Sequence, residues 1–120
     1  MLTGEFHFGK DVRLLKPADF RRVFQQAVKV HGPGFTLFAR RNGLGRARLG
    51  MAVGKKAVRR AVDRNRIRRL VRESFRHHKN DLSSLDIVFL ARKEILAHSR
   101  AMLSEHLNLA WKRLEKRCAS

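Results

Sequence analysis

The sequence has few of the residues from which covalent cross-links and cysteine-based metal sites are built. Cys118 is its only cysteine, so no disulfide bond can form within the chain. A single thiol also excludes the common structural zinc sites, which use several cysteines. We therefore expect Cys118 to be an unpaired thiol in the C-terminal tail.

Long apolar segments are missing as well. The longest clearly apolar run is IVFLA at 87–91, whereas a membrane-spanning helix needs about 20 such residues. The N-terminal stretch MLTGEFHFGKDVRLLK lacks the apolar core of a signal peptide. These features favour a cytoplasmic protein without a membrane partner.

Acidic residues are scarce and dispersed. Ten Asp and Glu residues face 28 Lys and Arg residues, which gives a net charge of +18 at pH 7. Such an excess destabilises a compact chain by self-repulsion, and the usual compensation is a polyanionic partner such as nucleic acid. A metal-dependent nuclease needs clustered carboxylates, and no P-loop or dinucleotide fingerprint is present. We therefore expect no catalytic residue and no metal site on the protein itself.

The hydrophobic pattern predicts one α/β (α+β) domain spanning residues 1–120, with the element order α-β-β-α-β-α. Residues 1–12 are expected to be a loose basic arm. The predicted elements are a helix at 17–28, strands at 35–40 and 48–53, a basic helix at 57–78, a strand at 86–92 and a helix at 99–116. The turn residues Asn42, Gly43 and Gly45 predict that the first two strands form a β-hairpin. The third strand is apolar on both faces and is expected to be central, in a mixed sheet with a helical crossover.

The basic helix contains the run RNRIRRLVR at 64–72. A helical projection places one apolar stripe toward the core, formed by Ile67, Leu70, Val71, Ser74 and Phe75. Asn65, Arg68, Arg69, Arg72 and Arg76 fall on the opposite side, and Arg64 and Arg66 flank them. Val58, Ala61 and Val62 do not share the stripe, so these residues pack elsewhere or the helix begins irregularly.

Two interpretations of this arginine-rich side can be compared. A solvated face would need nearby carboxylates for ion pairs, and only Asp63 and Glu73 are available. These two acids are expected to tether neighbouring arginines. A phosphate-binding surface needs long cationic side chains, and arginine adds a planar fork for two hydrogen bonds. Asn65 could contact a base edge, a ribose hydroxyl or a backbone carbonyl. The sequence therefore favours a nucleic-acid contact.

Three phenylalanines leave two interpretations open. Phe20 and Phe24 lie one turn apart on the first helix, and Phe38 lies on the less apolar face of a strand with Arg40 and Arg48. The rings could belong to the core, or they could stack on single-stranded bases beside the arginines. The pattern alone does not decide between these roles.

The segment GKKAVRRAVDRNRIRRLVRESFR at 54–76 resembles the signature helix of the bacterial ribonuclease P protein subunit. RLLKPADFRRVF at 13–24, the following strands and DIVFLAR at 86–92 are also similar to that family, so the resemblance covers about residues 12–115. It implies a two-layer, ribosomal-protein-like domain with a left-handed βαβ crossover. It also implies an endoribonuclease that removes the 5′ leader of precursor tRNA, in which the RNA supplies the active site and binds the divalent metal, Mg²⁺.

The resemblance also implies roles for individual residues. RNA contact is implied for Lys55, Lys56, Arg64, Asn65, Arg66, Arg68, Arg69 and Arg72, and Arg76 lies on the same side of the helix. A cleft for the leader is implied for Phe20, Phe24 and Phe38, with Arg40 beside it. No specific role is assigned to Arg59 and Arg60. The implied partners are the ribonuclease P RNA and precursor tRNA.

Other binding classes are weaker alternatives. A ribosomal or general RNA-binding module could use the same basic helix. A DNA-binding regulator is disfavoured because no helix-turn-helix pair precedes that helix. A membrane-surface role is disfavoured because the apolar stripe is needed to cover the sheet. We therefore expect no DNA partner.

Overall fold

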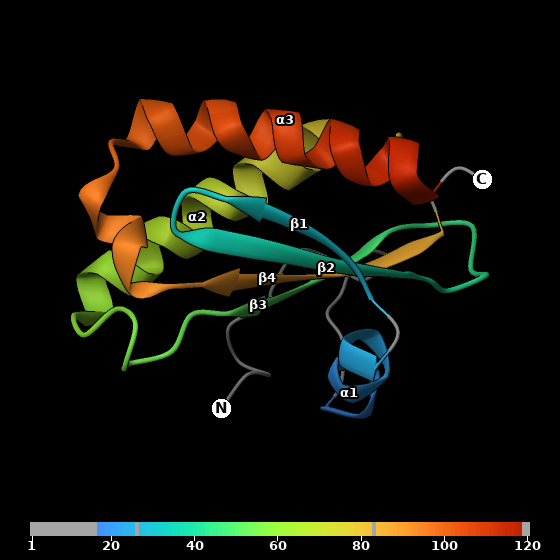
Figure 1. Cartoon of the computed structure of the whole chain (residues 1–120), viewed down its shortest axis with the longest axis horizontal. Coiled ribbons are helices and arrows are strands. Elements are labelled where there is room, and N and C mark those ends of the chain that lie inside the picture. The colour runs from blue at the N-terminus through green and yellow to red at the C-terminus, as the bar shows by residue number, and fades with distance from the viewer. Residues whose placement is uncertain (1–16, 26, 83, 119–120) are drawn as a thin grey trace.

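The computed structural model of the 120-residue chain describes residues 17–25, 27–82 and 84–118. The elements are α1 (Pro17–Gln25), β1 (Val28–Gly32), β2 (Phe35–Arg41), β3 (Arg48–Ala52), α2 (Ala61–His78), β4 (Leu85–Ala91), the 3₁₀-helix η2 (Lys93–Ala97) and α3 (Arg100–Cys118). They form one α/β domain in which α2 and α3 cover one face of the sheet, and α1 lies against the other (Figure 1). The predicted arm at 1–12 lies outside the described residues. None of the described helices is long and apolar enough to cross a membrane.

The four strands form a mixed sheet in the order β1-β2-β4-β3. The prediction of a central third strand is confirmed, because β4 pairs antiparallel with β2 and parallel with β3. The predicted crossover is confirmed as well, since α2 joins the parallel strands β3 and β4. Parallel neighbours need such a long connection, whereas antiparallel neighbours can be joined by a tight turn.

The predicted hairpin between residues 35–40 and 48–53 is wrong. β4 lies between β2 and β3, and the true partner of β2 in a hairpin is β1, with Val28 opposite Ala39 and Gly32 opposite Phe35. The HGPG segment at 31–34 therefore contains the end of β1 and the hairpin turn at Pro33 and Gly34, and α1 ends earlier than predicted. Alternation of apolar residues reports which face a side chain occupies, but it does not identify the neighbouring strand.

The loop at 42–47, which the turn residues suggested was a hairpin turn, instead packs beside the start of β4. The backbone N–H of Asn42 donates to the Ser84 carbonyl at 2.8 Å, and the Gly45 N–H donates to the Ser84 hydroxyl at 3.0 Å. Gly43 and Gly45 have positive φ values, so the turn chemistry was identified correctly. The error concerned the partner of the strands and not the conformation of the loop.

The basic helix begins at Ala61, four residues later than predicted. Val58 is fully buried in the preceding loop, where its N–H donates to the Gly54 carbonyl at 2.9 Å. Val62 is exposed on the first turn of α2. The apolar residues that did not fit the helical stripe are thereby explained, because Val58 packs from the loop and Val62 remains in solvent.

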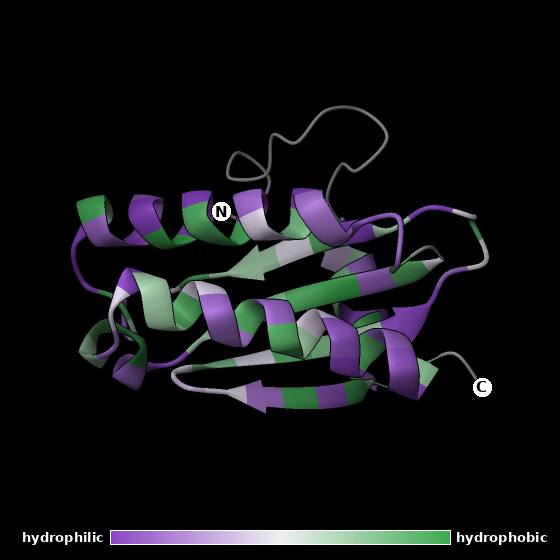
Figure 2. Ribbon diagram, turned by 90° about the horizontal axis from the view of Figure 1, so that it is seen from above, coloured by the Kyte–Doolittle hydropathy of each residue, from purple (hydrophilic) through white to green (hydrophobic). Residues whose placement is uncertain are grey.

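The main core lies between the sheet and the pair of helices α2 and α3. Figure 2 shows these helices side by side over the strands, with hydrophilic residues interrupting the hydrophobic ones along both. The rings of Phe75 and Trp111 meet edge to face at 5.8 Å, and the Trp111 indole N–H donates to the Ser74 hydroxyl at 2.8 Å. Burial of a large apolar side chain contributes roughly 1.5–3 kcal/mol. The packing therefore fixes which side of α2 faces outward.

Candidate nucleic-acid interface

The apolar stripe of α2 sets the direction of its arginines. Ile67, Val71, Ser74 and Phe75 are buried, as the projection predicted, and Leu70 is half-buried. The polar residues then divide into two groups. The outward group consists of Asn65, Arg66, Arg69 and Arg76, which are exposed, and the edge group consists of Arg64, Arg68 and Arg72, which are half-buried. We refer to these seven residues together as the arginine surface.

The edge group is spaced by four residues, so its side chains follow one another along a single side of the helix. The Arg64 Nη1 donates to the backbone carbonyls of Val58 at 3.0 Å and Arg59 at 2.9 Å. Arg64 therefore holds the loop that precedes α2 against the first turn of the helix. This contact is intramolecular and could not be read from the charge pattern.

Asn65 has a partner within the helix. Its Oδ1 accepts a hydrogen bond from Arg68 Nη1 at 3.1 Å. The side-chain amide also has two N–H donors, which suit a phosphate, ribose or base acceptor. The asparagine thus orients a neighbouring guanidinium and presents a neutral donor on the same surface.

The carboxylates of α2 pair with neighbouring arginines, as expected. The Arg76 Nη2 lies 2.5 and 2.6 Å from the two carboxylate oxygens of Glu73, and the Arg60 Nε lies 4.0 Å from Asp63 Oδ2. Exposed pairs of this kind contribute only about 0.2–1 kcal/mol. Six arginines and two carboxylates lie between Ala61 and His78, so the helix remains strongly cationic. Lys55 and Lys56 are exposed in the turn before α2 and extend this charge toward its N-terminal end.

A second cluster lies on the sheet face that carries α1. The rings of Phe24 and Phe38 meet edge to face at 4.9 Å, with an interplanar angle of 76°. Phe24 is 42% exposed and Phe38 is half-buried. Lys29 stands opposite Phe38 across β1 and β2, with its Nζ 5.8 Å from the ring centroid. We call these three residues the aromatic cluster. Lys29 was missed in the sequence because β1 itself was missed.

Phe20, which the resemblance placed in the leader cleft, has a different environment from Phe24. It is only 5% exposed and packs on Gly50 of β3, where a Cβ atom would lie 2.5 Å from the ring. Phe20 therefore anchors α1 to the sheet as a core residue and offers little ring surface to a base. The predicted leader contact remains a prediction for Phe24 and Phe38.

A buried carboxylate organises the end of this face. Asp86 of β4 is 5% exposed and accepts hydrogen bonds from Arg48 Nε at 2.8 Å, Arg48 Nη2 at 2.7 Å and Asn42 Nδ2 at 2.8 Å. The hydrogen bond from Arg48 to Asp86 raises the pKa of the Arg48 guanidinium further above its usual value. A lone acid inside the apolar segment DIVFLAR was the signal in the sequence that could have indicated this ion pair.

Two arginines link this end of the sheet to α1. Arg48 Nη2 lies 3.7 Å from Asp19 Oδ1, and Arg40 Nη1 donates to the Arg22 carbonyl at 3.2 Å. Arg40, predicted to lie beside the leader cleft, therefore holds the helix that carries Phe24. These contacts position α1 relative to Phe38, which makes the geometry of the aromatic cluster dependent on them.

The residues that the structure describes contain no group of three or more His, Cys, Asp or Glu side chains arranged to hold a metal ion. His78, adjacent to exposed His77, has its Nε2 3.1 Å from Asn108 Oδ1 of α3. Of the eight acidic residues that the structure describes, five lie within ion-pair distance of arginine: Asp19, Asp63, Glu73, Asp86 and Glu94. The described surfaces thus present cations and aromatic rings, and their carboxylates serve mainly to hold arginines.

Comparison with known proteins places these features in a family. The family model described as Ribonuclease P matches residues 8–115. The Ribonuclease P protein component of Chromohalobacter salexigens is 49% identical over 110 residues, covering 91% of this chain and 86% of that protein. The one from Thioalkalivibrio sulfidiphilus is 43% identical over 113 residues, covering 94% of each chain.

A solved structure agrees with the sequence relatives. The RNase P protein of Staphylococcus aureus superposes with a TM-score of 0.78 at 31% identity, covering 87% of this chain and 95% of that chain. The family model spans the described residues up to 115 and includes the segment at 54–76 that resembles the family. The chain belongs to the ribonuclease P protein family.

Proposed function

We propose that this chain supplies ribonuclease P with two RNA-binding surfaces and leaves the breaking of the phosphodiester bond to the RNA of the enzyme. Membership of the family makes it a protein component of ribonuclease P, the endoribonuclease that processes tRNA. The more detailed proposal concerns which residues meet which RNA. The single observation that carries it is the arginine surface, held outward by the buried stripe of α2.

The arginine surface suits the RNA backbone. Arginine forks bind phosphate with two hydrogen bonds, and each neutralised phosphate releases counterions, which favours binding at low salt. Because Ile67, Val71 and Phe75 anchor the opposite side of the helix, little ordering is needed before binding. We assign this surface, with Lys55 and Lys56, to the ribonuclease P RNA and to the substrate near the cleavage site.

The aromatic cluster suits the 5′ leader of precursor tRNA, which is single-stranded. Stacking of a base on an aromatic side chain contributes about 1–3 kcal/mol and tolerates different base sequences. Phe24 and Phe38 offer partly exposed rings, and the Lys29 ammonium beside Phe38 provides a nearby cation for a phosphate. This combination is typical of sites that bind single strands without strict sequence preference.

The chemistry is assigned to the RNA and to the Mg²⁺ that the RNA would hold. Phosphodiester hydrolysis by a protein nuclease uses clustered carboxylates with metal ions or positioned acids and bases. The Asp86 carboxylate is enclosed by Arg48 and Asn42, and Glu73 is paired with Arg76. Asp19, Asp63 and Glu94 lie within ion-pair distance of arginine. Asp81 lies exposed after α2, and Glu105 and Glu115 lie exposed ten residues apart on α3, so these three do not form a carboxylate cluster.

A reconstitution tests this proposal. Cleavage of precursor tRNA by a bacterial ribonuclease P RNA is measured at low Mg²⁺ with and without the protein. We expect clear stimulation by the protein and no cleavage by the protein alone. Absence of stimulation would favour a general RNA-binding module, and robust cleavage without the RNA would refute the assignment of chemistry to RNA.

A further inference from the structure

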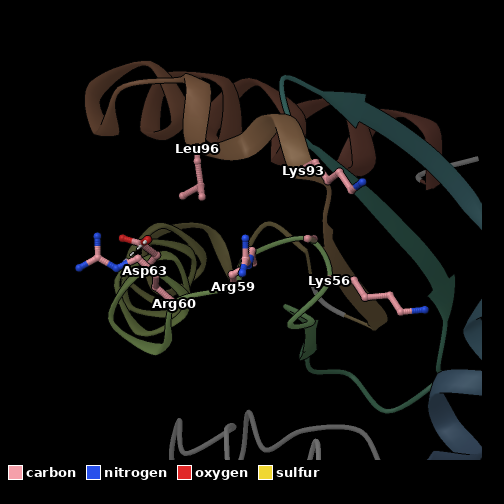
Figure 3. A pocket seen from close by; sticks show the side chains of 7 residues that line it. Lys56, Arg59, Arg60, Asp63, Lys93 and Leu96 are labelled. Atoms are coloured by element: carbon pink, nitrogen blue, oxygen red, sulfur yellow. Dashed lines mark ion pairs between the residues drawn. The ribbon is translucent and has the colours of Figure 1, made fainter.

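A basic groove lies between the N-terminal end of α2 and the 3₁₀-helix η2, and Lys56 is the one residue of its lining that also belongs to the proposed RNA-binding surface at α2. Its volume is about 760 Å³, and it is lined by Lys56, Ala57, Arg59, Arg60, Asp63, Lys93 and Leu96. Figure 3 shows Arg59 directed from the loop toward η2 and Leu96 directed from η2 toward α2. Lys56 and Lys93 extend together to one side of these two residues, and the Arg60 guanidinium lies on the other side, beside Asp63. The groove is therefore formed by two segments that are far apart in the sequence.

The topology of the sheet explains the position of the groove. β3 and β4 are parallel neighbours, so the loop to α2 and the start of η2 both leave from the same edge of the sheet. Crevices at the carboxyl ends of parallel strands commonly bind ligands in α/β proteins. The first turn of α2 borders the groove, and the N-cap residue of this helix, Arg60, makes no side-chain capping hydrogen bond. The helix dipole therefore adds to the attraction for an anion.

The charge of the groove is strongly positive. Four cationic side chains and one carboxylate line it, which gives a net charge of +3. The carboxylate of Asp63 lies 4.0 Å from Arg60, and the Arg60 side chain is largely exposed. Surface pairing of this kind is weak and does not remove the attraction for a phosphate.

Both walls of the groove are fixed by the fold. Arg64 donates to the carbonyls of Val58 and Arg59 and so holds the loop wall. On the other side, the Arg92 N–H donates to the Gly34 carbonyl at 2.8 Å, and Ile95 is buried so close to Gly34 that a Cβ atom there would lie 2.3 Å from the Ile95 Cα. A groove with preformed walls loses little entropy when a ligand binds.

The groove also offers apolar surface next to the cations. Leu96 is 52% exposed, so its side chain offers apolar contact surface beside the four cationic residues. A smaller hollow of about 260 Å³ shares Asp63 and Leu96 with the groove and continues along α2 over Ile67 and Leu70. A free phosphate would use only the cations, whereas a nucleotide would use the cations and the apolar surface together.

We infer that this groove binds one nucleotide unit of an RNA strand, with the phosphodiester at Arg59 and the base against Leu96. Arg60 and Lys93 extend toward opposite ends of the groove, where the adjoining phosphates of the strand would lie (Figure 3). The inference rests on the proposed function, since it assumes an RNA partner. It adds a binding site on η2 and the preceding loop that is separate from the arginine surface and the aromatic cluster.

The first test measures two affinities over a range of KCl concentrations: that of the intact chain for ribonuclease P RNA, and that of the reconstituted enzyme for precursor tRNA. The Arg59→Ala/Lys93→Ala variant is compared with Lys112→Ala/Arg113→Ala, which removes two exposed charges from α3. Each lost phosphate contact lowers the salt slope by about 0.7–0.9. We expect a lower slope and roughly tenfold weaker binding for the groove variant relative to the α3 variant. The difference is expected with the RNA that supplies the nucleotide, and equal slopes and affinities for the two variants with both RNAs would overturn the inference.

The second test places a photoreactive p-benzoylphenylalanine at Leu96 or, as a control, at Leu109, an exposed leucine of α3. Irradiation is done with ribonuclease P RNA alone and with the complete enzyme bound to precursor tRNA, so the cross-linked RNA identifies the source of the nucleotide. We expect a cross-link to one defined nucleotide from position 96 and none from position 109. Diffuse or equal cross-linking would contradict the groove site, even if the charge variants weakened binding.

The two proposals fail in different ways. If the unaltered protein does not bind ribonuclease P RNA, the proposed function is refuted, and the groove inference falls with it. If the unaltered protein binds and stimulates cleavage, but the groove variant matches the α3 variant, only the groove inference is refuted.

Discussion

The arginine surface places its cations along a single helix, whereas the aromatic cluster joins three elements that are brought together only by the fold. On α2 the buried stripe and the exposed arginines follow from one helical period. Phe24, Lys29 and Phe38 come from α1, β1 and β2, and their separation depends on Arg40, Arg48 and Asp86. RNA binding by the arginine surface should therefore tolerate the loss of one arginine. The geometry of the aromatic cluster should instead be sensitive to substitutions of the residues that hold α1.

The largest effect is expected from Phe20→Ala, which removes the ring that packs on Gly50. Truncation of a buried Phe typically costs about 3–5 kcal/mol of unfolding free energy. Urea denaturation should show this loss, and Phe24→Ala, one turn away and partly exposed, should cost about 1 kcal/mol. Similar losses for the two variants would mean that Phe20 and Phe24 do not have the different roles described.

A comparable effect is expected from Asp86→Ala. The change leaves the Arg48 guanidinium and the Asn42 amide without their shared acceptor, and breaking a buried pair of this kind costs about 3 kcal/mol. Urea denaturation would measure the loss. Glu105→Ala, which removes an exposed carboxylate on α3, serves as the control and should change stability by less than about 0.5 kcal/mol. A change of similar size in the control would argue that net charge, and not the Asp86 contacts, is responsible.

An intermediate effect is expected from Phe24→Ala on substrate choice. Loss of one stacking ring should reduce affinity for precursor tRNA by about 1–3 kcal/mol. Affinity for mature tRNA, which has no leader, should stay unchanged. Binding of both RNAs to the reconstituted enzyme provides the measurement, and an equal loss for both would return Phe24 to a packing role.

The smallest effect is expected from Arg69→Ala, on the outward part of the arginine surface. One lost phosphate contact should lower the salt slope of RNA binding by about 0.7–0.9 and weaken precursor and mature tRNA equally. Titrations at several KCl concentrations give this slope. An unchanged slope would remove Arg69 from the phosphate-binding surface.

The sequence predicted α2 well because helical periodicity reports burial directly, and Ile67, Val71 and Phe75 are all buried. It failed for β1 because VKVHG follows a helical segment directly and was read as part of its termination. It also paired β2 with the wrong strand, since the partner of a strand depends on tertiary contacts.

The candidate binding sites also divide into features that local sequence patterns predict and features that depend on tertiary contacts. The arginines of α2 could be listed from the sequence, but Arg64 as a support of the preceding loop could not. Phe20 and Phe24 look equivalent in the helical pattern, and only the contact with Gly50 separates them. The groove beside η2 is lined by Arg59 from the loop before α2 and by Lys93 from η2, and no local sequence pattern indicates that these distant segments border one groove.

The central claim is that the aromatic cluster recognises the leader while the arginine surface binds the RNA backbone without regard to the leader. Its most direct test measures the ratio of precursor to mature tRNA affinity, at several salt concentrations, for Phe24→Ala/Phe38→Ala and for Arg66→Ala/Arg69→Ala in the reconstituted enzyme. For the Phe24/Phe38 variant, the account predicts a lower ratio of precursor to mature tRNA affinity and an unchanged salt slope. For the Arg66/Arg69 variant, it predicts an unchanged ratio and a lower salt slope. If both variants change the ratio and the slope together, the two surfaces do not have separate functions.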